Sequence, residues 1–113
     1  MDSLVLIQDI QKEDLYIQTI KQLNKDFQLA NIDKNIDELI ESIELKNELE
    51  KIVFDLLTNN YDDYLNLLYR VDVPESELRK LSSKILTETV GEIAFLIMKR
   101  EFQKVWFKKR YSN

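Results

Sequence analysis

The sequence of 113 residues contains no cysteine and no histidine. Without cysteine, the chain cannot form disulfides, thiolate nucleophiles or cysteine-based metal sites. Without histidine, it lacks the usual base of serine and cysteine nucleophiles and the side chain that titrates near neutral pH. Catalysis would depend on carboxylates, lysine, arginine, tyrosine or serine, and the adjacent carboxylates of this chain would not converge on a helix. We therefore expect no enzyme activity, no cofactor and no small-molecule substrate.

Glycine and proline each occur once, as Gly91 and Pro74. Average usage is about 7% and about 5%. Sheet proteins need turn residues at every hairpin. The scarcity of glycine and proline therefore predicts an all-α protein in which long helices are joined by short connections. A chain of this length is also within the usual size of one domain, roughly 100–150 residues. We expect one helical domain over residues 1–113.

Long apolar runs are also absent. The longest strongly apolar run, 93–98, has six residues, whereas a membrane-spanning helix needs about 20. The first residues lack the positive flank and the long apolar region of a secretion signal. By default we expect a cytoplasmic location.

Apolar residues recur at helical spacing in several stretches of the chain. These stretches predict helices over 15–30, 36–57 and 61–68, and a final segment from 75 to about 106. Residues 71–74 form the clearest boundary, because the residue before a proline avoids the helical conformation. Residues 3–10 are either a separate segment or an extension of the first helix. The final segment is either one long helix or two joined near Gly91, which gives a four- to five-helix bundle.

Oxygen-bearing side chains at 33–44 follow a spacing that resembles the EF-hand calcium loop. Asp33, Asn35 and Asp37 correspond to the first ligands, and Glu44 to the carboxylate that closes the site. The family requires glycine at the sharp bend, where this chain has Glu38. We therefore favour helix capping, with Asn35 as the N-cap and Glu38 three residues later, and expect no metal site.

Charge is divided unevenly along the chain. Residues 1–75 contain 17 Asp and Glu against 7 Lys and Arg, a net charge of −10. Residues 76–113 contain 4 against 9, a net charge of +5, so the whole chain has −5. Basic and aromatic residues are concentrated in segment 99–111. They are Lys99, Arg100, Phe102, Lys104, Trp106, Phe107, Lys108, Lys109, Arg110 and Tyr111.

This basic aromatic segment has several interpretations. Phe102, Val105 and Trp106 lie on one helical face and form either core or an interface. The cations either neutralise the acidic body, within the molecule or across a dimer, or they contact a partner. We favour the structural role for this segment; among partners, another protein or self-association is favoured over nucleic acid or membrane. Basic side chains can also bind phosphates, and exposed rings can stack on bases, so nucleic acid or an anionic membrane remains the alternative.

A second aromatic cluster contains Tyr61, Tyr64, Tyr69 and Arg70. Tyr and Arg are common at binding hot spots, although Tyr also closes the edge of small cores. We expect a non-catalytic helical interaction module, either an adaptor or a small regulatory subunit. Its binding residues are expected in the basic aromatic segment or beside the tyrosines. The alternative is a nucleic-acid accessory protein that uses the basic segment.

Overall fold

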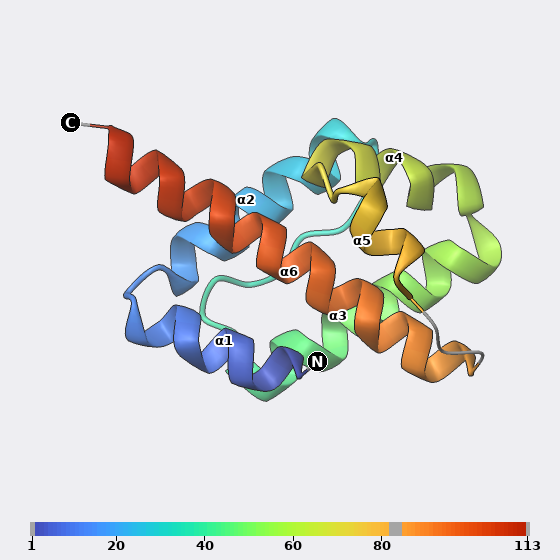
Figure 1. The fold of residues 1–113 in the computed structure, drawn as a ribbon, viewed down its shortest axis with the longest axis horizontal. Coiled ribbons are helices and arrows are strands. Elements are labelled where there is room, and N and C mark those ends of the chain that lie inside the picture. Colours follow the sequence, from blue (N-terminus) through green and yellow to red (C-terminus); the bar gives the residue numbers. More distant parts are fainter. Residues whose placement is uncertain (1, 82–84, 113) are drawn as a thin grey trace.

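The computed structural model describes residues 2–81 and 85–112, which contain helices and no strand (Figure 1). The described helices are α1 (Ser3–Lys12), α2 (Tyr16–Leu29), α3 (Ser42–Asn59), α4 (Tyr61–Val71), α5 (Glu75–Arg79) and α6 (Leu86–Tyr111). The predicted all-α fold with a long C-terminal helix is therefore confirmed. There are six helices in the described residues because α1 is separate and short α5 precedes α6.

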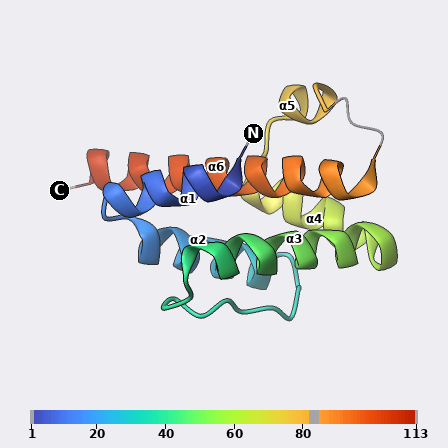
Figure 2. The ribbon, with the colours of Figure 1, turned by 90° about the horizontal axis from the view of Figure 1, so that it is seen from below.

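Helix α6 connects the rest of the bundle. It packs against α1, α2, α3 and α4. Figure 2 shows α1 and α6 in one layer, with α2 and α3 in the layer below. The core between them consists of large buried side chains, among them Phe27, Ile20, Leu49, Ile97 and Met98. None of the described helices is both long and apolar enough to span a membrane.

The tight turns use aspartate and asparagine where glycine is scarce. Asp14, Asn31 and Asp72 have positive φ angles of 59°, 60° and 68°. Short polar side chains tolerate this left-handed conformation better than other non-glycine residues. These residues lie at the ends of α1, α2 and α4, so they set where the chain reverses direction.

The helix that we predicted from Ile36 is wrong over its first turns, because α3 begins only at Ser42. Asn24 in α2 binds the backbone of Ile36 on both sides: its Nδ2 donates to the carbonyl, and its Oδ1 accepts from the amide, each at 2.8 Å. The Tyr16 hydroxyl donates to the carbonyl of Ile40. These bonds hold the connection along α2, and Leu39 is 81% exposed instead of buried.

The capping interpretation of the EF-hand-like residues is also wrong. Asp33, Asn35 and Asp37 lie in the connection before α3, not at its N-terminus, and only Glu44 lies in its first turn. Asp37 Oδ1 accepts a local bond from the Leu39 amide at 2.9 Å. Within residues 2–81 and 85–112, no group of three or more acidic side chains is placed to hold a metal ion.

The boundary predicted at 71–74 is confirmed. Helix α4 ends at Val71, and Pro74 precedes the first turn of α5. Of the two alternatives around Gly91, one continuous helix is confirmed, because α6 runs through Gly91 without interruption and appears straight in Figure 2. The final segment instead breaks between α5 and α6, and residues 82–84 of that break lie outside the described part of the chain.

Candidate functional site

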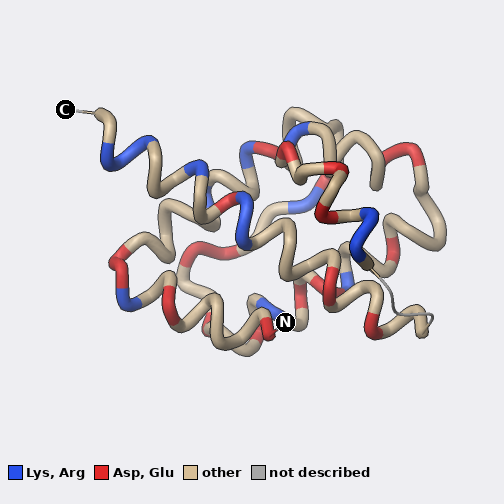
Figure 3. Tube along the Cα trace, viewed as in Figure 1, with Lys and Arg blue, Asp and Glu red and all other residues tan. Residues whose placement is uncertain are grey.

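The basic C-terminal end of α6 extends beyond the other helices, as the blue segments in Figure 3 show. Two of its cations are engaged within the molecule. Arg100 donates to the backbone carbonyl and the carboxylate of Asp72, both at 3.0 Å. Lys104 binds Asp26 at 2.6 Å. Arg100 and Lys104 therefore hold the fold, whereas Lys99, Lys108, Lys109 and Arg110 are exposed.

The aromatic residues at this end of α6 differ in burial. Trp106 is half-buried and packs against the core, and the Arg110 guanidinium lies 5.3 Å from its ring centre. Phe107 and Tyr111 are exposed, and their rings stack at 6.0 Å. Trp106 is thus part of the core edge, whereas Phe107 and Tyr111 face solvent.

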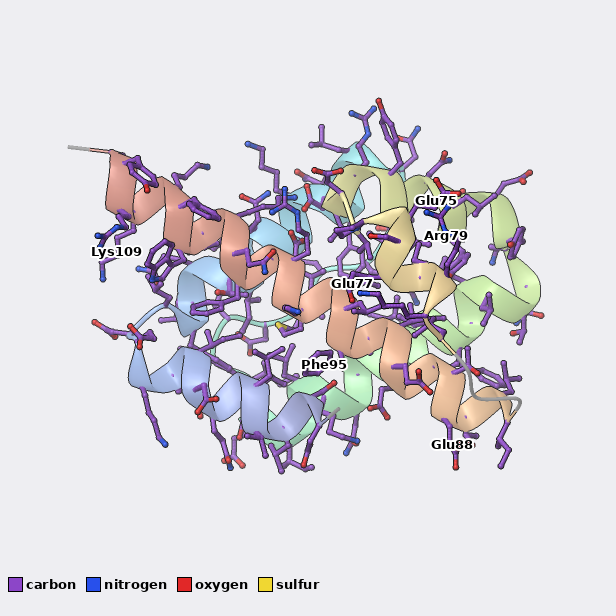
Figure 4. The ribbon with its side chains drawn as sticks, in the orientation of Figure 1. Glu75, Glu77, Arg79, Glu88, Phe95 and Lys109 are labelled. Carbon is purple, nitrogen blue, oxygen red and sulfur yellow. The ribbon has the colours of Figure 1, made fainter. Side chains whose placement is uncertain are left out.

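A groove of about 480 Å³ lies between α2 and the last turns of α6. Its cations are Lys21 and Lys25 from α2 and Lys108 and Lys109 from α6; we call it the lysine groove. The buried Leu15 and the buried Val105 also line it. Figure 4 shows Lys109 extending outward from the end of α6. The lining residues include no acid.

Three charged side chains meet between α2 and α6, next in the sequence to the groove residues Lys25 and Val105: Asp26, Glu101 and Lys104, which we call the buried charge cluster. The side chains of Asp26 and Glu101 are 3% and 0% exposed. Besides Asp26, the Lys104 ammonium donates to the carbonyls of Arg70 and Val71 at the end of α4, each at 3.2 Å. The cluster therefore joins α2, α4 and α6.

Glu101 is the unusual member of the cluster. Lys104 Nζ lies 3.1 Å from its Oε1 in an ion pair, and neither carboxyl oxygen has a hydrogen-bond partner among the described residues. Burial, followed by the neighbouring Asp26 carboxylate, raises the pKa of Glu101 to about 9, against the opposing effect of Lys104. When protonated, Glu101 can donate its hydroxyl to Asp26, so the proton gives the buried carboxyl a partner.

Sequence reasoning missed this cluster, although a signal was present. Asp26 falls in the apolar stripe of Leu23, Phe27 and Ala30, and Glu101 occupies the same face of its helix as Ile97 and Val105. An acid at a core-facing position of a helix requires a buried partner. The partner itself could not be identified, because Asp26 and Glu101 are far apart in the sequence.

A second groove, of about 590 Å³, lies among α4, α5 and α6. We call it the tyrosine groove, because Tyr61, Tyr64 and Tyr69 line it. Tyr64 is buried, and its ring centre lies 5.5 Å from that of Tyr61. Burial is the main cause that raises the pKa of Tyr64 to about 12. Tyr69 is 78% exposed, and Arg70 lies over its ring at 5.8 Å.

The remaining lining of the tyrosine groove is largely aliphatic. It consists of Leu57, Leu65, Leu68, Val73, Leu78, Leu81 and Ile93, with Thr89. The charged lining residues are paired: Glu75 with Arg79 at 3.5 Å, and Asp72 with Arg100. Figure 4 shows Glu75 and Arg79 together on α5, next to α4. The tyrosine groove is therefore apolar and close to neutral.

The two grooves lie at different ends of α6. Thr89 and Ile93 belong to the tyrosine groove, and Val105, Lys108 and Lys109 to the lysine groove. The carboxyl with the raised pKa, Glu101, is completely buried between them, so its position gives a substrate no access. Comparisons of the chain with known protein families, curated proteins and solved structures gave no significant match.

Proposed function

We propose that this protein is a non-catalytic helical interaction module, an adaptor or small regulatory subunit, that binds an apolar segment of another protein in the tyrosine groove. The observation that carries the proposal is the composition of that groove. Aromatic and aliphatic side chains line most of it, and Tyr61, Leu65 and Tyr69 are exposed there. Tyrosine gives a binding surface large apolar contact area with little loss of side-chain freedom.

The charges around the groove support an apolar partner over a charged one. Asp72, Glu75 and Arg79, which line it, are each in an ion pair within the molecule. A partner that brought an unpaired charge into the groove would lose water without gaining an opposite charge. The apolar face of an amphipathic helix fits these conditions, since it offers side chains at intervals of three and four residues.

The nucleic-acid alternative receives less support. Arg100 and Lys104, two of the six cations assigned to it, are bound to Asp72 and Asp26. Trp106, one of the rings expected to stack on bases, packs against the core. The location of this module in the cytoplasm is part of the same proposal and agrees with the acidic, cysteine-free sequence.

Two leucine substitutions of the same kind test the proposal. Leu65 is 46% exposed in the tyrosine groove, and Leu39 is 81% exposed in the connection before α3. The unaltered protein, Leu65→Lys and Leu39→Lys are immobilised in turn and exposed to nuclease-treated lysate of the native host. We expect one protein to be retained at near-equal stoichiometry by the unaltered protein and by Leu39→Lys, and to be lost from Leu65→Lys.

Other results would contradict the proposal. Equal retention by both variants would show that the tyrosine groove is not the binding surface. Retention from untreated lysate that is lost from nuclease-treated lysate would favour the nucleic-acid alternative. A dimer in sedimentation that Leu65→Lys dissociates would show that the groove binds a second copy of the chain.

A further inference from the structure

The lysine groove concentrates cations that the molecule itself does not neutralise. Within residues 2–81 and 85–112, Lys21, Lys25, Lys108 and Lys109 form no ion pair. Six of the eleven other described cations pair with nearby acids: Lys12, Lys46, Arg79, Lys80, Arg100 and Lys104. Four uncompensated ammonium groups around one groove are unexpected in a chain with a net charge of −5. They repel one another until an anion lies between them.

The floor of the groove limits what that anion can be. Leu15 and Val105, which are buried core residues, line the groove between the lysines. A simple inorganic anion would gain nothing from contact with these apolar side chains. A ligand that carries carboxylates on its edges and an apolar side chain at its centre would satisfy both parts of the groove.

Helix geometry argues against single-stranded nucleic acid as the ligand. Such a strand needs cations for its phosphates and aromatic rings for its bases on the same surface. At 3.6 residues per turn, Phe107 and Tyr111 point roughly 160° and 120° away from Val105 around α6. Neither ring lines the lysine groove. A strand bound there would therefore have no ring on which to stack.

We propose that the lysine groove is a second protein-binding site, which binds an acidic segment of another protein. Carboxylates of that segment contact Lys21 and Lys25 on one wall and Lys108 and Lys109 on the other. An apolar side chain between the carboxylates contacts Leu15 and Val105. The site is separate from the tyrosine groove, at the other end of α6, so the two sites can be occupied together.

A synthetic peptide of alternating Glu and Leu residues provides the probe. Its binding is measured by fluorescence anisotropy against the full chain, beside a Glu–Ser peptide of equal charge and an oligothymidine. In the test variant, Lys21→Gln and Lys109→Gln remove one cation from each wall. The control variant, Lys34→Gln with Lys51→Gln, makes the same charge change at exposed lysines that do not line the groove.

We expect the test variant to bind the Glu–Leu peptide roughly five- to tenfold more weakly, since two surface charge contacts are lost. The control variant is expected to lose less than about twofold, because distant surface charges are largely screened. The Glu–Ser peptide is expected to bind more weakly than the Glu–Leu peptide. Leu65→Lys is expected to leave this binding unchanged, which separates the site from the tyrosine groove.

Several results would overturn the proposal. No binding of the Glu–Leu peptide by the unaltered protein, or an equal loss in both lysine variants, would show that the groove is not a specific site. Equal binding of the Glu–Ser peptide would show that the apolar floor has no role. Oligothymidine that binds more tightly than the peptide and is weakened only by the test variant would assign the groove to nucleic acid.

Discussion

The two grooves of this bundle share α6 but differ in how their charges are balanced. In the tyrosine groove, Asp72 and Glu75 are paired with Arg100 and Arg79. Exposed pairs of this kind add little stability, so their main effect is to leave an apolar surface without a net charge. In the lysine groove, four lysines remain unpaired among the described residues. The difference shows that one helix can present a neutral apolar surface at one end and a cationic surface at the other.

The walls of the grooves are also held by different forces. Buried apolar side chains such as Leu68, Val73 and Ile93 hold the tyrosine groove. The two helices that form the lysine groove, α2 and α6, are joined by the ion pair between Asp26 and Lys104, next to Glu101. Apolar packing does not depend on protonation, whereas a buried charge cluster does. The stability of the two ends should therefore respond differently to mutation and to pH.

The largest expected effect on stability comes from a substitution in the apolar wall of the tyrosine groove. Ile93→Ala removes a side chain that is 2% exposed and should lower the free energy of unfolding by about 3–4 kcal/mol. The difference in stability between pH 6 and pH 8 should be the same as in the unaltered protein. Urea denaturation at both pH values measures this. A changed pH dependence would show that the two ends are not independent.

Removal of the cation from the buried charge cluster should have a somewhat smaller effect. Lys104→Met leaves Asp26 and Glu101 without their ammonium partner and removes the bonds to the carbonyls at the end of α4. Because the Lys104 side chain is 21% exposed, we expect a loss of about 2–3 kcal/mol. Lys99→Met, at an exposed position of the same helix, is the control and should cost less than about 0.5 kcal/mol. Equal losses would exclude a special role for the cluster.

The pH dependence of stability should come from Glu101. The folded pKa of Glu101, about 9, lies above the usual glutamate value of 4.5, so between these values the folded protein keeps a proton that the unfolded chain has released. The stability that this proton provides is complete below the unfolded pKa and is lost as the pH rises toward 9. The chain has no histidine, so few other side chains titrate between pH 6 and pH 8.

Glu101→Gln isolates this effect. The amide stays neutral at every pH and can still donate to Asp26. We expect the unaltered protein to lose roughly 2–3 kcal/mol between pH 6 and pH 8, and Glu101→Gln to lose little over the same interval. The stability difference between the variant and the unaltered protein should therefore widen by about 2 kcal/mol from pH 6 to pH 8, in favour of the variant. Parallel stability curves for the two proteins would contradict this assignment.

The smallest expected effect concerns the helix that connects the two grooves. A methyl group on Gly91 would lie 3.7 Å from Glu50 Oε2, an ordinary contact. Gly91→Ala should therefore stabilise α6 by about 0.5–1 kcal/mol. Thermal denaturation measures the gain, and binding at both grooves should not change. Weaker binding at either groove would indicate that α6 bends at Gly91 during binding.

Much of the fold could be predicted from the sequence because the apolar stripes determine which helix faces are buried. The stripe of Ile20, Leu23 and Phe27 lies in the core as predicted. The apolar stripe that begins at Ile36 gave a wrong helix prediction, because Asn24 holds Ile36 in a non-helical connection. A contact between a side chain and the backbone of a residue farther along the chain leaves no periodic pattern in the sequence.

The candidate sites could be predicted only in part. Tyr61, Tyr64 and Tyr69 are neighbours in one helix, so their shared surface followed from the sequence. Lys21 and Lys25 join Lys108 and Lys109 only through the packing of α2 against α6. In the sequence, Lys21 and Lys25 belong to the acidic part of the chain, residues 1–75. The sequence therefore indicated the basic residues at the end of α6 but not the lysines of α2 that lie opposite them.

The packing of α6 against α1, α2 and α3 also bears on how the protein is made. A ribosome completes α1 at Lys12 and begins α6 only at Leu86. At about 5–20 residues per second, roughly 4–15 seconds pass between these points. During this time the apolar faces of the earlier helices lack the helix that covers them. We expect the nascent chain to be a substrate for chaperones until α6 leaves the ribosome.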